Sequence, residues 1–210
     1  MPRPSNGDLR RAILDAARSA LLEKGYTQLS LRPLARSVGC TATSIYLHFP
    51  NKDGLIHALI DEGMDLLHER LEAASSGVGD PEARVRALTR AYLDFGIEQS
   101  EYYEIMFMLH PERMERYPAE KYRKARRNLD LFAEALAGLT GRSVAELQLP
   151  ATIIWSSLHG LVALLIARRI DIRLNRDALL DEAVEQAVRL AAGWRKPAAG
   201  PPPAATRPAP

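Results

Sequence analysis

The sequence contains little cysteine, few aromatic residues and almost no net charge. Of its 210 residues one is cysteine and 6% are aromatic, and the formal net charge is +2. A single cysteine excludes an internal disulfide, and Cys40 is more simply interpreted as a small hydrophobic residue than as a redox sensor. The first eleven residues lack the apolar segment of a secretion signal. We therefore expect a cytoplasmic protein.

Sequence motifs of enzymes are also missing. The chain has no phosphate-binding glycine loop, no dinucleotide fingerprint and no nucleophile elbow. Its five histidines are scattered, and only His57 and Asp61 have a spacing that metal ligands use, which one exposed helical turn explains equally well. These absences disfavour an enzyme, and they predict neither a metal nor a cofactor.

The residues that are abundant favour helices. Hydrophobic residues make up 47% and charged residues 26% of the chain, a balance typical of globular proteins. Apolar residues recur with helical spacing, and no strand-like alternation is visible. The predicted helices cover residues 8–24, 31–38, 41–48, 51–71, 80 onward, 100–109, 118–139, 151–167 and 176–194. Asn51 is a candidate cap for the fourth of them, and Asp80 opens the fifth. The predicted fold is therefore all-α, with about nine helices.

Composition divides the chain into parts. A small-residue break at 73–79 separates an N-terminal helical part from a larger C-terminal helical part. Residues 1–52 contain eight Lys or Arg against three acidic residues, whereas the rest of the chain contains 20 against 23. Such a local basic excess suits phosphate neutralisation. The Pro/Ala-rich segment 196–210 is predicted to be disordered.

One predicted helix, 151–167, is apolar almost all round. Its 17 residues are interrupted by Ser156, Ser157 and His159, and a bilayer needs about 20 apolar residues. We therefore interpret it as a helix that is buried on more than one side, and we expect no membrane contact.

The segment 30–49 has the pattern of a helix-turn-helix. Ser30 is a candidate cap for a short helix that ends at Gly39, and Thr41 is a candidate cap for the next one. Only residues 39–41 separate the two helices. In this motif the second helix enters the DNA major groove.

Residues 30–55 resemble the DNA-binding segment of the TetR family of bacterial transcription regulators, and the likeness extends over about 7–67. It rests on Leu34, Ala35, Val38, Gly39, Ile45, Tyr46, His48, Phe49, Lys52, Asp53 and Leu55. At Cys40 the family usually has an aliphatic residue. The resemblance implies a regulator, by default a repressor, that binds a palindromic double-stranded DNA operator and responds to a small-molecule effector. It also implies a DNA-binding domain over 7–67 and a ligand-binding and dimerisation domain over 80–195.

Seven residues are candidates for DNA contact. Short side chains on the second helix of the motif can meet base edges, whereas hydroxyl, imidazole and ammonium groups suit phosphates. The set is Arg32, Thr41, Ala42, Thr43, Tyr46, His48 and Lys52. The alternatives are structural, because Tyr46 could pack on the following helix, His48 could lie at a boundary and Thr41 could serve only as a cap.

An aromatic and methionine-rich cluster in the second domain suggests a ligand pocket. The stretch 155–160 resembles the Trp/His/Gly element that names one class of TetR C-terminal domains. The candidate lining is Phe95, Tyr102, Tyr103, Met106, Phe107, His110, Trp155 and His159. A solid core explains the same cluster equally well.

Base contacts from one short helix are few, so specificity requires two copies about 34–36 Å apart. We therefore expect a homodimer, built on the last two helices as in the TetR family. The candidate interface residues are Ser156, Gly160, Ala167, Val184, Ala187 and Ala191. The alternative is that both helices only complete the core of the monomer.

The working mechanism is a two-state switch in which the filled pocket moves helices connected to the fourth helix and so changes the separation of the two DNA-binding domains. A regulator that acts without an inducer and a small helical enzyme remain as alternatives. The basic run 121–127 is interpreted as a solvated face rather than as a second nucleic-acid contact.

Overall fold

The computed structural model describes residues 6–109 and 122–195. Over these residues it contains nine α-helices, a π-helical turn, a 3-10 turn and no strand, which confirms the all-α prediction. In chain order the elements are α1 (Asn6–Gln28), α2 (Leu31–Val38), α3 (Ala42–His48), α4 (Lys52–Ser75), α5 (Pro81–Glu98), α6 (Ser100–Tyr103), η1 (Glu104–Met108), α7 (Tyr122–Thr140), η3 (Ala145–Leu147), α8 (Gln148–Ile166) and α9 (Arg176–Ala192).

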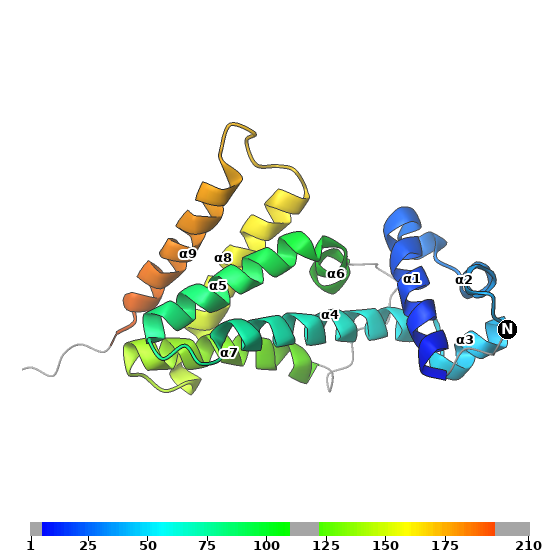
Figure 1. Ribbon diagram of the computed structural model, residues 1–210, viewed down its shortest axis with the longest axis horizontal. Coiled ribbons are helices and arrows are strands. Elements are labelled where there is room, and N and C mark those ends of the chain that lie inside the picture. Colours follow the sequence, from blue (N-terminus) through cyan, green and yellow to red (C-terminus); the bar gives the residue numbers. More distant parts are fainter. Residues whose placement is uncertain (1–5, 110–121, 196–210) are drawn as a thin grey trace, which may run out of the picture.

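Helices α1, α2 and α3 form a small bundle at one end of an elongated molecule (Figure 1). Ile45 and Leu34 are buried where these helices cross, as predicted, whereas Val38 is only half-buried. Gly39 ends α2 in the left-handed conformation, with a φ of 74°, and so permits the tight turn into α3. The geometry of this turn fixes the angle at which α3 leaves the bundle.

Side-chain caps start two of the helices in this region. The Thr41 hydroxyl oxygen accepts a hydrogen bond from the Ser44 amide at 3.1 Å, and the Asn51 amide oxygen accepts one from the Gly54 amide at 2.7 Å. Both caps confirm the sequence prediction. Ser30 stands at the start of α2, but its side chain forms no capping hydrogen bond.

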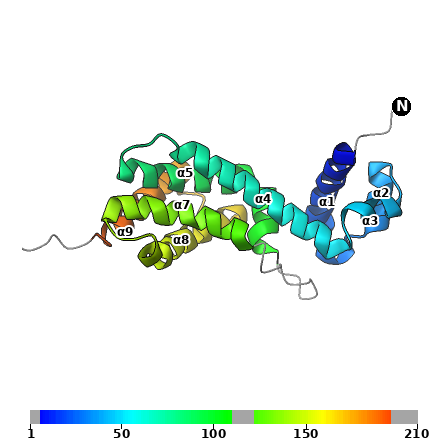
Figure 2. The same ribbon diagram turned by 90° about the horizontal axis from the view of Figure 1, so that it is seen from below.

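Helix α4 joins the two parts of the molecule. Its 24 residues span about 36 Å at 1.5 Å per residue. The first half, including Leu55 and Leu59, packs into the N-terminal core, and Leu67 and Leu71 pack into the larger C-terminal core. Figure 2 shows α4 crossing from the three small helices to the C-terminal helices. A movement of α4 is therefore shared by both cores.

The C-terminal core lies between α4, α5, α7, α8 and α9. Its largest fully buried side chains include Tyr92, Tyr103 and Phe95. Helix α8 packs against α5 at Gly96, where a Cβ atom would lie 2.5 Å from Val162 Cγ1. Helices α8 and α9 form an antiparallel pair that projects from the rest of the molecule (Figure 1).

The segment 100–109 differs from its prediction as one α-helix. Helix α6 has only four residues, and the chain then widens into the π-helical turn η1. Here Met106 and Tyr102 pack directly against Gly63 of α4, where any Cβ atom would collide with Met106. The predicted start of the helix at 118 and the tail 196–210 lie outside the described residues.

The apolar helix near the C-terminus is longer than predicted. The helical stretch Ala145–Ile166 has 22 residues and a mean hydropathy of 1.8, so by length and composition it could cross a membrane. The estimate of 17 residues was too short because the helix begins before Ala151. One face, with Ala151, Ile154 and Val162, is buried in the chain's own core. Only 28% of the apolar window is buried, so the predicted burial on more than one side is wrong for the single chain.

Candidate DNA-binding surface and ligand cavity

Helix α3 presents an exposed face beside α2. Thr43 is exposed, Tyr46 is 53% exposed, and Ala42 and His48 are half-buried. On the opposite side Ile45 is fully buried and anchors the helix. The α3 candidates and the capping residue Thr41 therefore lie together at one end of the molecule, and Arg32 is exposed on the neighbouring α2.

Leu47 belongs to the same face, although the sequence analysis did not single it out. Its side chain is 83% exposed, which is unusual for leucine. Apolar side chains on a groove-facing helix can meet thymine methyl groups. The signal in the sequence was an apolar residue between two polar candidates, Tyr46 and His48.

Lys52 occupies a different environment from the one predicted. Its ammonium group donates to the Tyr26 carbonyl at 2.9 Å and lies 3.9 Å from the centre of the Tyr26 ring. The Tyr26 hydroxyl in turn donates to Asp53 at 2.8 Å. Partial burial, with a smaller contribution from Asp53, raises the pKa of Tyr26. Lys52 thus ties the end of α1 to the start of α4, and its contact with phosphate stays a prediction.

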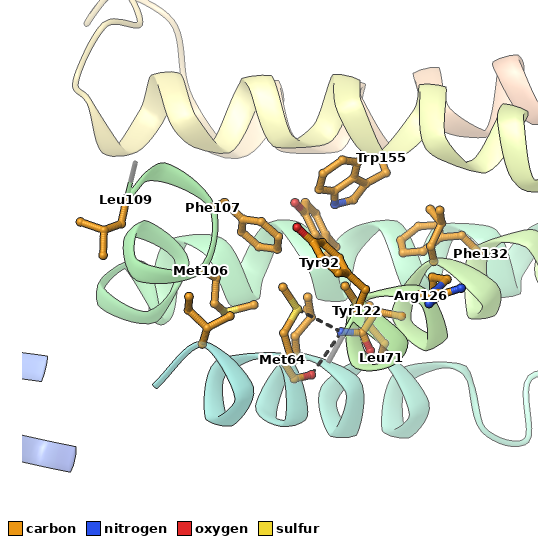
Figure 3. Close-up of a pocket in the computed structure, with 15 residues that line it drawn as sticks. Met64, Leu71, Tyr92, Met106, Phe107, Leu109, Tyr122, Arg126, Phe132 and Trp155 are labelled. Carbon is orange, nitrogen blue, oxygen red and sulfur yellow. Dashed lines mark hydrogen bonds between the residues drawn. The ribbon is translucent and has the colours of Figure 1, made fainter. Parts of the chain in front are cut away.

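A cavity of about 470 Å³ lies inside the C-terminal part, within the range of ligand sites. The lining residues come from α4, α5, the η1 segment, α7 and α8, and Figure 3 shows α4 and α8 on opposite sides of them. The lining is Ile60, Met64, Leu67, Leu71, Tyr92, Met106, Phe107, Leu109, Tyr122, Ala125, Arg126, Asn128, Leu129, Phe132 and Trp155. Within the described residues a cavity therefore lies beside the predicted cluster, whereas Phe95, Tyr102 and Tyr103 of that cluster are buried in the core.

Only part of the predicted pocket lines this cavity. Met106, Phe107 and Trp155 do. Phe95, Tyr102, Tyr103 and His159 do not, and His110 lies outside the described residues. The prediction was incomplete because periodicity along one helix does not reveal which face a neighbouring helix covers. The α4 and α7 walls were missed, since their Met and Leu residues have ordinary core spacing.

Two of the predicted residues, Tyr103 and His159, form a hydrogen-bond chain with Tyr92, which lines the cavity. The Tyr92 and Tyr103 hydroxyls are 2.9 Å apart, and the Tyr103 hydroxyl lies 2.7 Å from Nδ1 of His159. Burial raises the pKa of both tyrosines and lowers that of His159. The rings of Trp155 and His159 stack with their centres 5.5 Å apart. These contacts hold Trp155 at the cavity wall.

Charged side chains of α7 have two different roles. Lys124 and Arg127 each lie 2.5 Å from a carboxylate oxygen of Asp65 on α4. Arg126 is the only charged residue among the described residues that line the cavity. Within the described part of the chain, Arg126 has no hydrogen bond or ion pair. Of the described residues in this run, Lys124 and Arg127 are therefore ion-paired to α4, whereas Arg126 faces the cavity.

A polar contact links the N-terminal bundle to the segment that forms the cavity wall. Arg18 of α1 donates to the Tyr102 hydroxyl at 2.6 Å, and its guanidinium lies 4.7 Å from the ring centre. The Tyr102 hydroxyl donates to Glu62 of α4 at 2.9 Å. Burial and the Glu62 contact raise the pKa of Tyr102 to about 12. Tyr102 therefore bridges α1, α4 and α6.

The predicted dimer residues separate into two groups. Val184, Ala187 and Ala191 of α9 are at most 8% exposed and belong to the core of their own chain, so their assignment to a dimer interface was wrong. The small residues fit there because α9 packs closely on α5. Ser156 and Ala167 are exposed, and nothing lies within 4 Å of a Cβ built on Gly160.

The open face of α8 is apolar. It carries Leu149, Ile153 and Leu164, which are 70%, 46% and 46% exposed.

Among the described residues no group of three or more His, Cys, Asp or Glu side chains could hold a metal ion.

Two family models match the chain and together cover most of it. One, described as "Bacterial regulatory proteins, tetR family", matches residues 13–59. The other, described as "Tetracyclin repressor-like, C-terminal domain", matches residues 85–187. The two matched regions fall on the helix-turn-helix bundle and on the part that contains the cavity.

Individual proteins are similar to parts or to most of the chain. The HTH-type transcriptional repressor Rv1474c of Mycobacterium tuberculosis is 38% identical over 82 residues, which span 38% of this chain and only 42% of that protein. A solved regulatory protein, SCO4313, is 21% identical with a TM-score of 0.73, covering 89% of this chain and 98% of its own. AibR, solved with isovaleryl coenzyme A and operator DNA, is 24% identical with a TM-score of 0.64, covering 85% and 97%. The two structures share the fold.

Proposed function

Because the chain belongs to the TetR family of bacterial regulatory proteins, we propose that it is a transcriptional repressor that leaves a palindromic operator when a small molecule fills its cavity. It is not an enzyme. The proposed boundaries are 7–67 for the DNA-binding domain and 80–195 for the ligand-binding and dimerisation domain. We place its action in the cytoplasm, where the operator is.

The observation that carries this proposal is the double role of α4. Its first half buries Leu55 and Leu59 against the helices that hold α3, and four residues of α4, from Ile60 to Leu71, line the cavity. A ligand that fits only one position of α4 would shift the population toward that position. The bundle that carries α3 would then move with α4.

A second path runs through Tyr102. Met106 lines the cavity and packs on Gly63, one helical turn along the segment from Tyr102. A ligand that displaces Met106 would therefore also act on the Arg18–Tyr102–Glu62 contact and so on α1. The cavity favours this switch over the alternative of a regulator without an inducer.

The proposed DNA contacts are Ala42, Thr43 and Tyr46 toward bases, with Arg32, Thr41, His48 and Lys52 toward phosphates. The exposed face of α3 supports the first group. Tyr26 holds Lys52 near the start of α4, so a phosphate would have to share its ammonium group. The operator complex of AibR, which has the same fold, lends support to this mode of binding.

Two copies are required for a palindromic operator, and we propose that they meet through α8. The exposed Ile153 and Leu164 lie on the face that carries Ser156 and Gly160, where a partner helix could approach closely. The exposed apolar face of α8 would then be covered by protein and would not meet a membrane.

Selection of bound duplexes from a random pool, using the full chain, tests the proposal. The expected product is a palindrome with half-sites about 34–36 Å apart. Tyr46→Ala and Thr43→Ala should each weaken specific binding roughly tenfold or more at unchanged helicity. Tyr46→Phe distinguishes the contribution of the hydroxyl to binding from that of the ring. Val144→Ala, far from α3 in sequence, is the control. Failure to enrich any sequence would refute the proposal.

A further inference from the structure

The cavity has a polarity gradient that specifies the kind of molecule it accepts. Its most deeply buried lining residues are Leu67, Leu71, Tyr92 and Phe132, which are 0–3% exposed. Three of them are apolar, and the hydroxyl of Tyr92 is hydrogen-bonded to Tyr103. At the other extreme, Tyr122 is 40% exposed and Arg126 is exposed. A ligand that follows this gradient has an apolar body inside and a polar group near α7.

The charge of that polar group follows from what lines the cavity. Among the described residues that line the cavity, Arg126 carries the only formal charge and none is acidic. The nearby acid Asp65 is already paired with Lys124 and Arg127, so it does not neutralise Arg126. A planar guanidinium without a partner binds carboxylate or phosphate groups in a bidentate manner. A cationic ligand would meet repulsion with no compensating carboxylate.

The uncharged polar side chains deep in the cavity already have hydrogen-bond partners, so they offer few hydrogen bonds to the body of a ligand. Asn128 donates to the Met64 carbonyl at 3.1 Å, and its side-chain oxygen lies 2.9 Å from Nδ1 of His68. The Tyr92 hydroxyl is engaged with Tyr103. By contrast, Met64 and Met106 offer flexible apolar side chains that adapt to different shapes.

We propose that the effector is an amphipathic organic anion, with an apolar chain or ring system between α4 and α7 and its acidic group at Arg126. This inference rests on the proposed function in assigning the cavity to the effector. The acid could be a free carboxylate or a phosphate-bearing carrier group, because Arg126 recognises both by the same chemistry.

Calorimetric titration of the full chain with three probes of equal chain length tests the charge preference: decanoate, 1-decanol and decylamine, each below its aggregation concentration. Decanoate should bind most tightly and decylamine least. Arg126→Gln should weaken decanoate binding roughly tenfold and leave 1-decanol unchanged. Arg123→Gln, which replaces an exposed arginine of the same helix outside the cavity, should change neither. Decyl phosphate in place of decanoate distinguishes the two acidic groups.

Equal binding of decanoate and 1-decanol, or no effect of Arg126→Gln, would overturn the inference. Binding that persists when Ala125→Trp narrows the cavity would place the probe elsewhere and would overturn it as well. The proposed function is judged separately by operator affinity at saturating decanoate. An unchanged affinity with the cavity occupied would count against the switch and leave the ligand class intact.

Discussion

Gly96 illustrates how a single residue sets the distance between two helices. A Cβ atom at this position would lie 2.5 Å from Val162 Cγ1 and 3.1 Å from the Tyr103 ring. Valine is branched at Cβ and has few alternative rotamers, so α8 itself would have to move. We expect Gly96→Ala to lower the free energy of unfolding by about 1–3 kcal/mol, measured by urea denaturation.

Gly138→Ala is the matched control for this prediction. Its Cβ would lie 3.6 Å from Pro81, an ordinary contact. Alanine is favoured over glycine inside a helix, so this variant should be as stable as the parent or more stable by about 0.5–1 kcal/mol. Equal effects of the two substitutions would contradict the role given to Gly96.

His159 should make the free energy of unfolding depend on pH. Burial lowers the pKa of the folded imidazole, whose Nδ1 atom lies 2.7 Å from the Tyr103 hydroxyl. Below the unfolded value of about 6.5, the unfolded chain takes up a proton that the folded chain refuses. The free energy of unfolding should therefore fall as the pH drops from 7.5 to 5.5, and His159→Gln should reduce that fall. An identical pH dependence in both proteins would exclude this contribution.

At the scale of elements, Tyr102 connects α1, α4 and α6 through its hydroxyl. Tyr102→Phe removes the group that accepts from Arg18 and donates to Glu62. A double-mutant cycle of Tyr102→Phe with Arg18→Met should give a coupling energy of about 1–2 kcal/mol in unfolding experiments. The cycle of Arg70→Gln with Glu98→Gln, an exposed α4–α5 ion pair, should give a smaller coupling. Additive effects at Tyr102 would show that the hydroxyl does not join the helices.

The elements themselves were largely predictable because their signals are local. Thr41, Asn51 and Asp80 cap the helices that the sequence assigned to them. The π-helical turn η1 was not predictable, since it depends on how Met106 packs on Gly63, a contact between residues distant in the chain. For the same reason the spacing of the α9 seam revealed close packing but not the packing partner.

At the scale of the whole molecule, the sequence located the DNA-binding end through one motif but did not define the cavity. Residues of four helices and of η1 line the cavity together, so no single segment of the sequence predicts it. In the sequence, Arg126 is one of several basic residues in a run. Lys124 and Arg127 differ from it only because Asp65 lies opposite them in the folded chain. Such a distinction exists only after the helices have packed.

The open face of α8 gives the last prediction. Leu164 is 46% exposed in the single chain, so Leu164→Glu should leave the fold and helicity intact. In the proposed dimer the same side chain would be covered, and an unpaired buried carboxylate is strongly unfavourable. Sedimentation equilibrium should therefore show monomers. Operator affinity should be lower than that of the parent, because fewer dimers are present. Leu66→Glu, on the exposed side of α4, should remain dimeric. A Leu164→Glu protein that is still dimeric would mean that the two copies meet through another surface.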